Sequence, residues 1–214
     1  MIEESRIFKD QVYGQFARVG KALASARRLE LLDLLSQGPK SVEGLAREMQ
    51  ASVANVSQHL QTLAQARLVT AHKQGTFVIY RLANSRVTDL LRGIQGLSEE
   101  VLAEVRELRQ MFLTQRDVLD PVGREELVQM MENPSGVYLI DVRSGQEYEA
   151  GHLRGAVSVP LPEVADHFRD WSGPQQIVAY CRGAYCLYAR DAVAVLGSMK
   201  ITARRTEVSV HDWH

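Results

Sequence analysis

Cysteine is scarce in this chain of 214 residues, and long apolar runs are missing altogether. The two cysteines, Cys181 and Cys186, are too few for a disulfide scaffold. No apolar run reaches the roughly 18 residues of a membrane-spanning helix, and no apolar signal-peptide core follows the charged first residues. We therefore expect a cytoplasmic protein with no membrane partner, in which a close cysteine pair is more often reactive than structural.

Net charge is also small, at −1, and 45% hydrophobic with 24% charged residues is ordinary globular composition. The charge is unevenly distributed, because residues 1–116 carry a balance of +4 and residues 117–214 a balance of −5. A positive first half is compatible with a nucleic-acid partner. The length fits one large domain or two small ones, and the spacing of the motifs described below favours two.

Both cysteines lie in a stretch with the order strand, loop, helix. Residues 177–180 predict a short buried strand, and the apolar spacing from Leu187 onward predicts a helix. The loop between them, residues 181–186, then opens a helix N-terminus, whose N–H groups stabilise an anion such as a thiolate. With Arg182 next in sequence, we expect the pKa of Cys181 to fall below its usual value of about 8.5. The alternative is that both cysteines are small core residues.

The first half has the element order of a DNA-binding module. Ser41 and Ser52 are expected to cap the third and fourth helices. The fourth helix turns an apolar stripe to the core and leaves Ser, Asn and Gln outside, where their donors and acceptors can address base edges. The alternative for that outer face is a solvated helix surface. Helices are predicted at 3–24, 29–35, 42–49, 53–64 and, as one long helix, 85–112, with a hairpin at 70–82.

Three segments of this half, residues 24–32, 56–63 and 75–82, resemble the ArsR family of dimeric winged-helix repressors. The Val-Ser-x-His-Leu-x-x-Leu core at 56–63 is the most specific of them. The resemblance covers about residues 5–112 and implies double-stranded operator DNA as partner and a homodimer built by the first and last helices. It makes residues 51–64 the recognition helix and residues 73–76 the wing tip. The residues expected to contact DNA are Arg27, Arg28, Ser52, Asn55, Ser57, Gln58, His59, Gln61, Lys73, Thr76 and Arg81. Of these, His59 is expected either to have a mainly structural role or to contact a phosphate.

Many ArsR proteins sense metals through cysteines at the third helix or through His and carboxylates on the last helix. Here the third helix has no Cys or His, and the last helix offers Asp and Glu but no His. Without thiolate or imidazole ligands, we expect no metal site in this half and no cofactor. Any sensing is expected in the second half.

The second half predicts alternating strands and helices after a linker at residues 114–122. Ser144 and Glu147 form a capping-box sequence at a helix start, which gives Glu147 a structural role. Such alternation is typical of an α/β parallel sheet, and in these sheets the site lies at the carboxyl ends of strands, where Cys181 falls. Strands are expected at 137–142, 156–160, 176–181 and 201–206, and helices at 124–132, from 145, at 161–168 and at 187–196.

The segment 139–160 contains strand-Asp-Val-Arg, a Glu-Tyr helix, Gly-His-x-x-Gly-Ala and a strand ending in Pro, and the cysteine strand follows it. Together these resemble a rhodanese domain, the sulfurtransferase module whose cysteine carries a persulfide. The resemblance covers about residues 123–213 and makes the fold two domains: a mainly α winged helix-turn-helix over 1–113, then an α/β rhodanese-like parallel sheet with flanking helices over 123–214.

Two parts of the second half depart from that family. Rhodanese loops commonly run Cys-x-x-Gly-x-Arg, whereas here Ala184 and Cys186 replace the glycine and the arginine. The missing arginine argues against a phosphatase, because a phosphate dianion would lack its bidentate clamp. The tail before Trp213 also lacks the usual Gly-Gly turn. The candidate catalytic residues are those of the loop: Cys181, Arg182, Gly183, Ala184, Tyr185 and Cys186.

The sequence is compatible with three functions. The first is a DNA-binding transcriptional regulator whose second domain senses or transfers sulfane sulfur, with Cys181 carrying the persulfide and Cys186 resolving it. The second is a thiosulfate or persulfide sulfurtransferase whose first half serves for dimerisation or targeting. The third is capture of arsenite or another soft ion by the two thiols. The expected small-molecule partner of the first two is a sulfane-sulfur, thiosulfate or persulfide donor.

Overall fold

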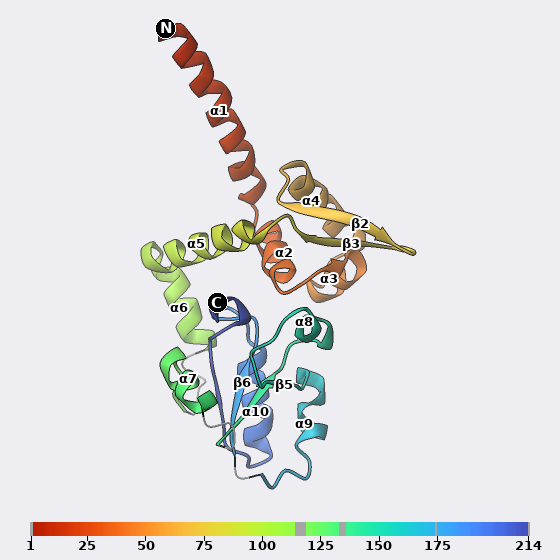
Figure 1. Cartoon of the computed structure of the whole chain (residues 1–214), viewed down its shortest axis with the longest axis vertical. Coiled ribbons are helices and arrows are strands. Elements are labelled where there is room, and N and C mark those ends of the chain that lie inside the picture. Colours follow the sequence, from red (N-terminus) through yellow and green to blue (C-terminus); the bar gives the residue numbers. More distant parts are fainter. Residues whose placement is uncertain (1, 114–118, 133–135, 174, 214) are drawn as a thin grey trace. The chain divides into compact units, whose positions relative to one another are not determined.

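The computed structural model describes residues 2–113, 119–132, 136–173 and 175–213. It divides into two compact units, Met1–Ser98 and Glu99–His214, which are described separately (Figure 1). Most of the linker predicted at 114–122 lies outside the described residues. Its last residue, Val122, forms a parallel bridge with Thr206 and donates its N–H to the Arg205 carbonyl at 2.8 Å, so it belongs to the second unit.

The first unit is a set of helices followed by a hairpin. Ser41 and Ser52 cap helices as predicted, because their hydroxyls accept from the N–H groups of Gly44 (3.0 Å) and Asn55 (3.2 Å). Strands β1 (Lys40–Ser41), β2 (Val69–Gln74) and β3 (Phe77–Leu82) form an antiparallel sheet in the order β1-β3-β2. The helices are α1 (Ile2–Leu23), α2 (Ala26–Ser36), α3 (Val42–Glu48), α4 (Val53–Gln65) and α5 (Ser85–Val101), whose last residues enter the second unit.

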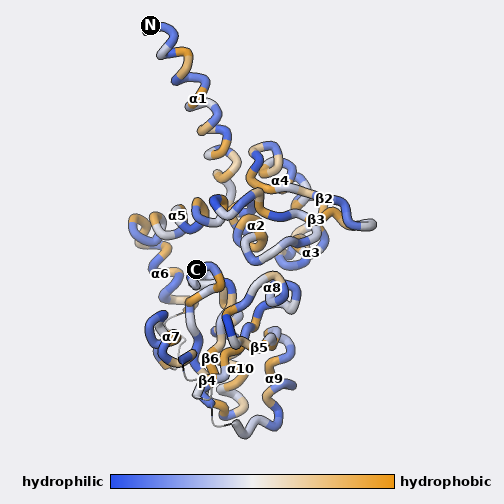
Figure 2. The backbone as a smooth tube through the Cα atoms, in the orientation of Figure 1, coloured by the Kyte–Doolittle hydropathy of each residue, from blue (hydrophilic) through white to orange (hydrophobic). Residues whose placement is uncertain are grey.

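Apolar side chains from these helices form one core, in which Leu31, Leu45, Leu60 and Leu63 are fully buried. The apolar stripe predicted on α4 consists of Val53, Val56, Leu60 and Leu63, and the last three are buried. The prediction is wrong for Val53, which lies in the first turn of α4 and is 46% exposed. Helix α1 differs from the others. Most of its length is exposed, and hydrophobic residues recur along it between hydrophilic ones (Figure 2).

The single long helix predicted over 85–112 is wrong. The helix is interrupted at Leu102, which has extended backbone angles, and a second helix, α6 (Ala103–Phe112), starts after it. Gly93 and Gly96 lie inside α5 without interrupting it, although glycine is a weak helix former. The end of α5 is held by Arg106, whose guanidinium donates to the carbonyls of Glu99 (2.6 Å) and Glu100 (2.8 Å). Helix-end carbonyls lack intrahelical partners, and this cation satisfies two of them.

The second unit contains a parallel sheet in the order β5-β4-β6-β7. The strands are β4 (Val137–Asp141), β5 (Val157–Ser158), β6 (Gln176–Tyr180) and β7 (Ala203–Arg205). The helices are α6, α7 (Arg124–Glu132), α8 (Gly145–Ala150), α9 (Val164–His167) and α10 (Tyr188–Ser198), with short 3₁₀ turns at Leu161–Glu163 and Val210–Asp212. The helix expected at 161–168 is therefore a 3₁₀ turn that leads into one helical turn.

Side chains of β6 alternate between two cores, as a strand buried on both faces requires. Ile177 and Ala179 join the cluster that contains Phe168 and Leu196, and Val178 and Tyr180 join the one around Leu127. The alternation sends Cys181, the next residue, into the first cluster. No helix in the described part of the chain is long and apolar enough to cross a membrane.

Candidate functional sites

The cysteine loop, residues 181–186, is called the thiol loop below. It follows β6 directly and leads into α10, so it lies at the carboxyl end of a central parallel strand and at a helix N-terminus, as predicted. Gly183 adopts φ +119°, a conformation that side chains rarely adopt, and a Cβ there would lie 3.5 Å from the Ser209 side chain. The Cys186 N–H donates to the Gly183 carbonyl at 3.1 Å and closes the loop.

The two thiols are free and differ in environment. Cys181 is only 2% exposed, its Sγ donates to the Cys186 carbonyl at 3.4 Å, and Cys186 is half-buried. Burial, together with the neighbouring Cys186, raises the pKa of Cys181 well above its ordinary value. A hydrogen bond from Cys181, then the N–H groups of Arg182 and Tyr188 and the Arg182 charge, lower the pKa of Cys186 to about 7 against the opposing effect of burial. The expectation of a lowered pKa for Cys181 is therefore wrong, and the lowered pKa belongs to Cys186.

Arg182 forms an ion pair with Glu147. Its guanidinium donates to both Glu147 oxygens, at 2.7 Å and 3.0 Å, and lies 5.2 Å from the centre of the Tyr188 ring. Glu147 is 1% exposed, and it also completes the capping box with Ser144 at the start of α8. Glu147 thus has the predicted capping role and a second role, as the anchor of the thiol loop.

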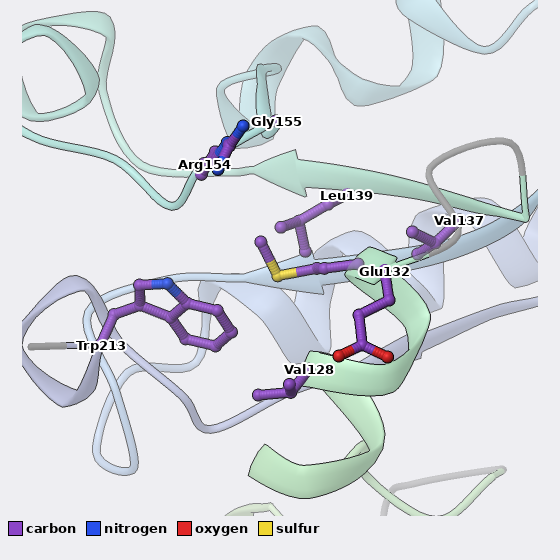
Figure 3. A pocket seen from close by; sticks show the side chains of 8 residues that line it. Val128, Glu132, Val137, Leu139, Arg154, Gly155 and Trp213 are labelled. Carbon is purple, nitrogen blue, oxygen red and sulfur yellow. The ribbon is translucent and has the colours of Figure 1, made fainter.

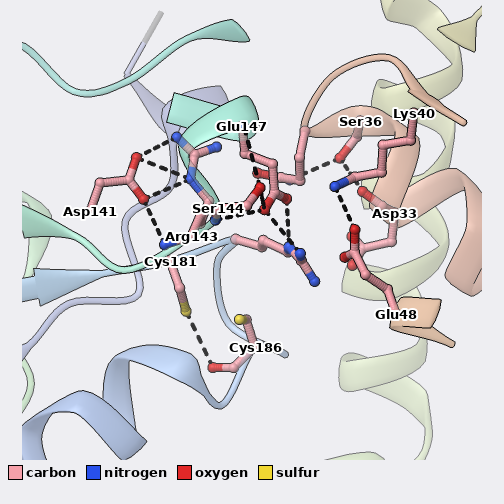
Figure 4. Close-up of polar contacts among 12 residues, drawn as sticks. Asp33, Ser36, Lys40, Glu48, Asp141, Arg143, Ser144, Glu147, Cys181 and Cys186 are labelled. Carbon is pink, nitrogen blue, oxygen red and sulfur yellow. Dashed lines mark hydrogen bonds and ion pairs between the residues drawn. The ribbon is translucent and has the colours of Figure 1, made fainter. Parts of the chain in front are cut away.

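A buried polar network lies beside the loop. Arg143, 1% exposed, donates from Nε (2.9 Å) and Nη2 (2.6 Å) to Asp141 and from Nη2 (2.7 Å) to the Gly151 carbonyl (Figure 4). Tyr180 donates to Asp141 at 2.7 Å and accepts from the Leu153 N–H at 3.0 Å. The Asp-Val-Arg and Gly-His segments are therefore joined at the end of β6 by satisfied buried polar groups.

Tyr185, at the exposed side of the loop, has a partner that sequence reasoning missed. Its hydroxyl donates to Glu99 at 3.1 Å, and Arg109 pairs with both Glu99 and Glu207. Burial and then the Glu99 charge raise the pKa of Tyr185. The segments are too far apart in sequence for any local pattern to have predicted the contact.

A cavity of about 470 Å³ lies apart from the thiols, among residues that include Val128, Leu139, Arg154 and Trp213 (Figure 3). Its lining is mainly apolar, and none of the candidate catalytic residues contributes to it. Within the described residues no three His, Cys, Asp or Glu side chains converge as they would around a metal ion.

The DNA-facing prediction concerns α4 and the hairpin. Asn55, Gln58 and Gln61 are exposed at helical spacing on one face, while Ser57 and His59 are half-buried. Ser52 is committed to its N-cap bond. The hairpin turns at Gly75 (φ +60°) and Thr76, so Lys73 and Thr76 lie at its exposed tip.

The arginines assigned to phosphates have protein partners. Arg27 pairs with Glu30 at 3.0 Å, and Arg81 donates to the Thr70 hydroxyl at 3.3 Å. Arg28 donates to main-chain carbonyls at the end of α1, including that of Lys21 at 3.0 Å, which gives it a structural task. The first unit also contains a pair of its own, Lys40–Glu48 at 2.8 Å, which joins β1 to α3 (Figure 4).

The order of α2, α3, α4 and the β2–β3 hairpin defines a winged helix-turn-helix, and the parallel sheet with its cysteine loop is rhodanese-like. Residues 25–71 match the model of the bacterial regulatory proteins of the arsR family, and residues 123–213 match that of the rhodanese-like domain. The chain belongs to the HTH-type transcriptional regulators in which an ArsR-type helix-turn-helix is combined with a rhodanese-like domain.

Known proteins similar to this chain include the HTH-type transcriptional regulator Rv0324 of Mycobacterium tuberculosis. It is 39% identical over 209 residues, which are 96% of this chain and 89% of that protein. The arsenical resistance operon repressor of Staphylococcus aureus is 32% identical over 38% of this chain and 79% of its own length. The solved homodimeric winged helix-turn-helix DNA-binding domain of Mb0332 from Mycobacterium bovis is 41% identical over 45% of this chain and 89% of its own, with a TM-score of 0.43.

Proposed function

We propose that the protein binds double-stranded operator DNA as a homodimer through its first unit and that the thiol pair of its second unit senses or transfers sulfane sulfur. The observation that carries the proposal is the pairing of two unlike thiols in one loop. The pKa of Cys186 is lowered to about 7, mainly by a hydrogen bond from Cys181, whereas burial raises the pKa of Cys181. Thiolate is the nucleophile in exchange with sulfane sulfur, and a neighbouring thiol can resolve the product.

The chemistry needs only the two thiols and a persulfide donor, R–S–SH. The Cys186 thiolate attacks the outer sulfur, the donor S–S bond breaks, RS⁻ leaves, and Cys186 becomes a persulfide. Cys181 then gives up its proton, its sulfur attacks the inner sulfur of that persulfide, and the sulfide that leaves takes up the proton as H₂S. The two cysteines are oxidised to a disulfide and the sulfane sulfur is reduced to sulfide, so electrons balance. This order, with Cys186 first, reverses the order expected from sequence.

The proposed DNA surface consists of α4 and the wing. Asn55 and Gln58 can form bidentate contacts with adenine edges, and Lys73 can neutralise a phosphate. The surface proposed for the homodimer is the apolar side of α1, where Ile7, Phe8 and Phe16 are each more than half exposed. Exposed apolar patches of this kind mark interaction sites, because burying them against a partner removes apolar surface from water.

The test combines intact mass with DNA binding on one sample of full-length protein. A duplex selected by the protein from a random pool serves as probe, and inorganic tetrasulfide serves as donor. We expect a mass change at the thiol loop, either a gain of sulfur or the loss of two hydrogens, that tracks a change in DNA affinity. Cys186→Ser should keep the DNA affinity of the reduced protein and lose the response. An equal response in Cys186→Ser would contradict the proposal.

An enzymatic function is the second candidate, and the match of residues 123–213 to the rhodanese-like domain favours it. A sulfurtransferase would turn over, passing sulfane sulfur from thiosulfate to cyanide and releasing thiocyanate and sulfite. Steady thiocyanate production that depends on either cysteine would support it. If each chain takes up one sulfur atom without turnover, the enzymatic function is excluded and the sensor function remains.

A further inference from the structure

We propose that Glu99 couples the thiol loop to helix α5, so that chemistry at Cys186 reaches the winged helix through the Tyr185–Glu99 hydrogen bond. The inference rests on the proposed function and names how that site would regulate DNA binding. It depends on a cluster of four side chains within the second unit: Glu99, Arg109, Tyr185 and Glu207.

The cluster joins three segments that are far apart in the chain. One oxygen of Glu99 accepts from the Tyr185 hydroxyl at 3.1 Å, and the other accepts from Arg109 on α6. The same guanidinium pairs with Glu207, which also pairs with Arg205 at 2.9 Å. The ionic members of the cluster are less than a third exposed, a setting in which charge-assisted hydrogen bonds are stronger than at an open surface. Glu99 is thus shared between a guanidinium and the phenol of the thiol loop.

The two sides of the thiol loop differ in exposure. Cys181 is 2% exposed, and a Cβ at Gly183 would be in ordinary van der Waals contact with Ser209 at 3.5 Å. Cys186 is half-buried and Tyr185 is exposed, so we expect a sulfur atom added to Cys186, or a bond from it to Cys181, to displace the exposed side of the loop. Tyr185 lies on that side, next to Cys186 in sequence, and its hydroxyl bond to Glu99 is the contact that such a movement would break.

Glu99 belongs to a helix that also contributes to the core of the first unit. Near its start, Val87 and Leu91 of α5 are buried with the winged-helix residues. Near its end, the Glu99 carboxylate meets Tyr185, and its main-chain carbonyl accepts from Arg106. Helix α5 is unbroken from Ser85 to Val101, so a change at Glu99 acts on the same helix that supplies Val87 and Leu91 to the winged-helix core.

The experiment measures coupling, defined as the ratio of the Kd for the selected duplex before and after tetrasulfide treatment of full-length protein. Wild type is expected to change by roughly tenfold or more, within the range typical of allosteric proteins. Glu99→Ala should load sulfur and bind DNA in the reduced state like wild type, yet change by less than about twofold. Glu100→Ala is the matched control, since Glu100 is the exposed neighbour on the same helix and its side chain lies outside the cluster.

A double-mutant cycle separates a relay from a general effect on folding. Tyr185→Phe removes one hydroxyl, and in a relay its effect on coupling and that of Glu99→Ala are not additive, because both remove the same bond. Additive effects, or full coupling in folded Glu99→Ala, would overturn the relay while the sensor stands. Wild-type protein that loads sulfur without any change in Kd would overturn the sensor itself, and the relay with it.

Discussion

Arg182 and Glu147 are joined by two hydrogen bonds, Nε to Oε1 at 2.7 Å and Nη2 to Oε2 at 3.0 Å, although 35 residues separate them in the chain. Because Glu147 is buried, the pair fixes the thiol loop to the start of α8. The Arg182 charge is also one of the causes that lower the pKa of Cys186, after the hydrogen bond from Cys181 and the N–H groups of Arg182 and Tyr188.

Replacing Glu147 should destabilise the protein and lower the pKa of Cys186. Glu147→Gln leaves a nearly buried guanidinium without its counter-charge, which costs about 3–5 kcal/mol when a buried pair is broken. The freed charge should lower the pKa of Cys186 further below about 7, since Arg182 already favours that thiolate. Urea unfolding measures the first effect, and the ultraviolet absorbance of the thiolate against pH measures the second.

The control is Glu149→Gln, an exposed carboxylate of the same helix. It should leave both quantities close to wild type, because surface charge changes rarely exceed about 0.5 kcal/mol. A Cys186 pKa that does not fall in Glu147→Gln would show that Arg182 acts on the loop only as a structural anchor.

The two thiols should alkylate at different rates. In Cys186→Ser the remaining Cys181 should react slowly with iodoacetamide at neutral pH, because its thiol is buried and protonated. In Cys181→Ala the remaining Cys186 should react, but with its pKa raised from about 7, because the hydrogen bond from Cys181 is its largest stabilising contact. Alkylation rate against pH, followed by mass spectrometry, gives both values. Fast alkylation of Cys181 in Cys186→Ser would assign the first nucleophile to Cys181 instead.

The raised pKa of Cys181 should appear as a stability loss at alkaline pH. In Cys186→Ser the unfolded chain releases the Cys181 proton above about pH 8.5, whereas the folded chain keeps it. The folded state then binds more protons than the unfolded state, so the free energy of unfolding falls as pH rises, by up to about 1.4 kcal/mol per pH unit.

Urea unfolding at pH 7 and pH 10 measures this loss, with the variant Cys181→Ala/Cys186→Ser as reference for all other groups. From pH 7 to pH 10 the free energy of unfolding of Cys186→Ser should fall by about 2 kcal/mol more than that of the reference variant. A constant difference would mean that the Cys181 thiol ionises as easily in the folded protein as in the unfolded one.

Two substitutions should separate base reading from phosphate contact in the first unit. Gln58→Ala should weaken binding to the selected duplex by about 1–3 kcal/mol and relax its preference at one base pair. Lys73→Gln should weaken binding to all sequences alike and reduce the slope of log K against log salt by about 1. Fluorescence anisotropy across a salt series gives both, with Lys200→Gln, an exposed lysine of the second unit, as control. Equal sequence preference in Gln58→Ala would remove α4 from base reading.

Local chemistry made much of the fold predictable. Ser41, Ser52 and Ser144 were identifiable as caps because a cap acts within three residues, and all three bonds are present. The short apolar run of β6 and the apolar spacing of the helix after the loop likewise depend on neighbours in sequence. The winged-helix and rhodanese-like classes follow from such segments in order.

Contacts between distant residues made the rest unpredictable. The break at Leu102 accompanies an arginine, Arg106, that caps the preceding helix from beyond the break, whereas the sequence pattern predicted one unbroken helix over 85–112. The pKa of Cys181 was misjudged because its raised value comes from burial in the folded core and then from Cys186, and no local pattern shows how deeply one cysteine is buried. The Tyr185–Glu99 bond spans 86 residues, and no local pattern encodes it.

Two thiols that share one set of donors also limit how much charge the thiol loop can hold. The anion on Cys186 is among the causes that keep the proton on Cys181, so the loop accommodates one full negative charge and resists a second. A persulfide on Cys186 would occupy that place in turn. In the proposed sensor each chain would therefore respond once, and the response of many molecules would depend on the fraction of thiol loops converted rather than on the number of sulfur atoms that each one has met.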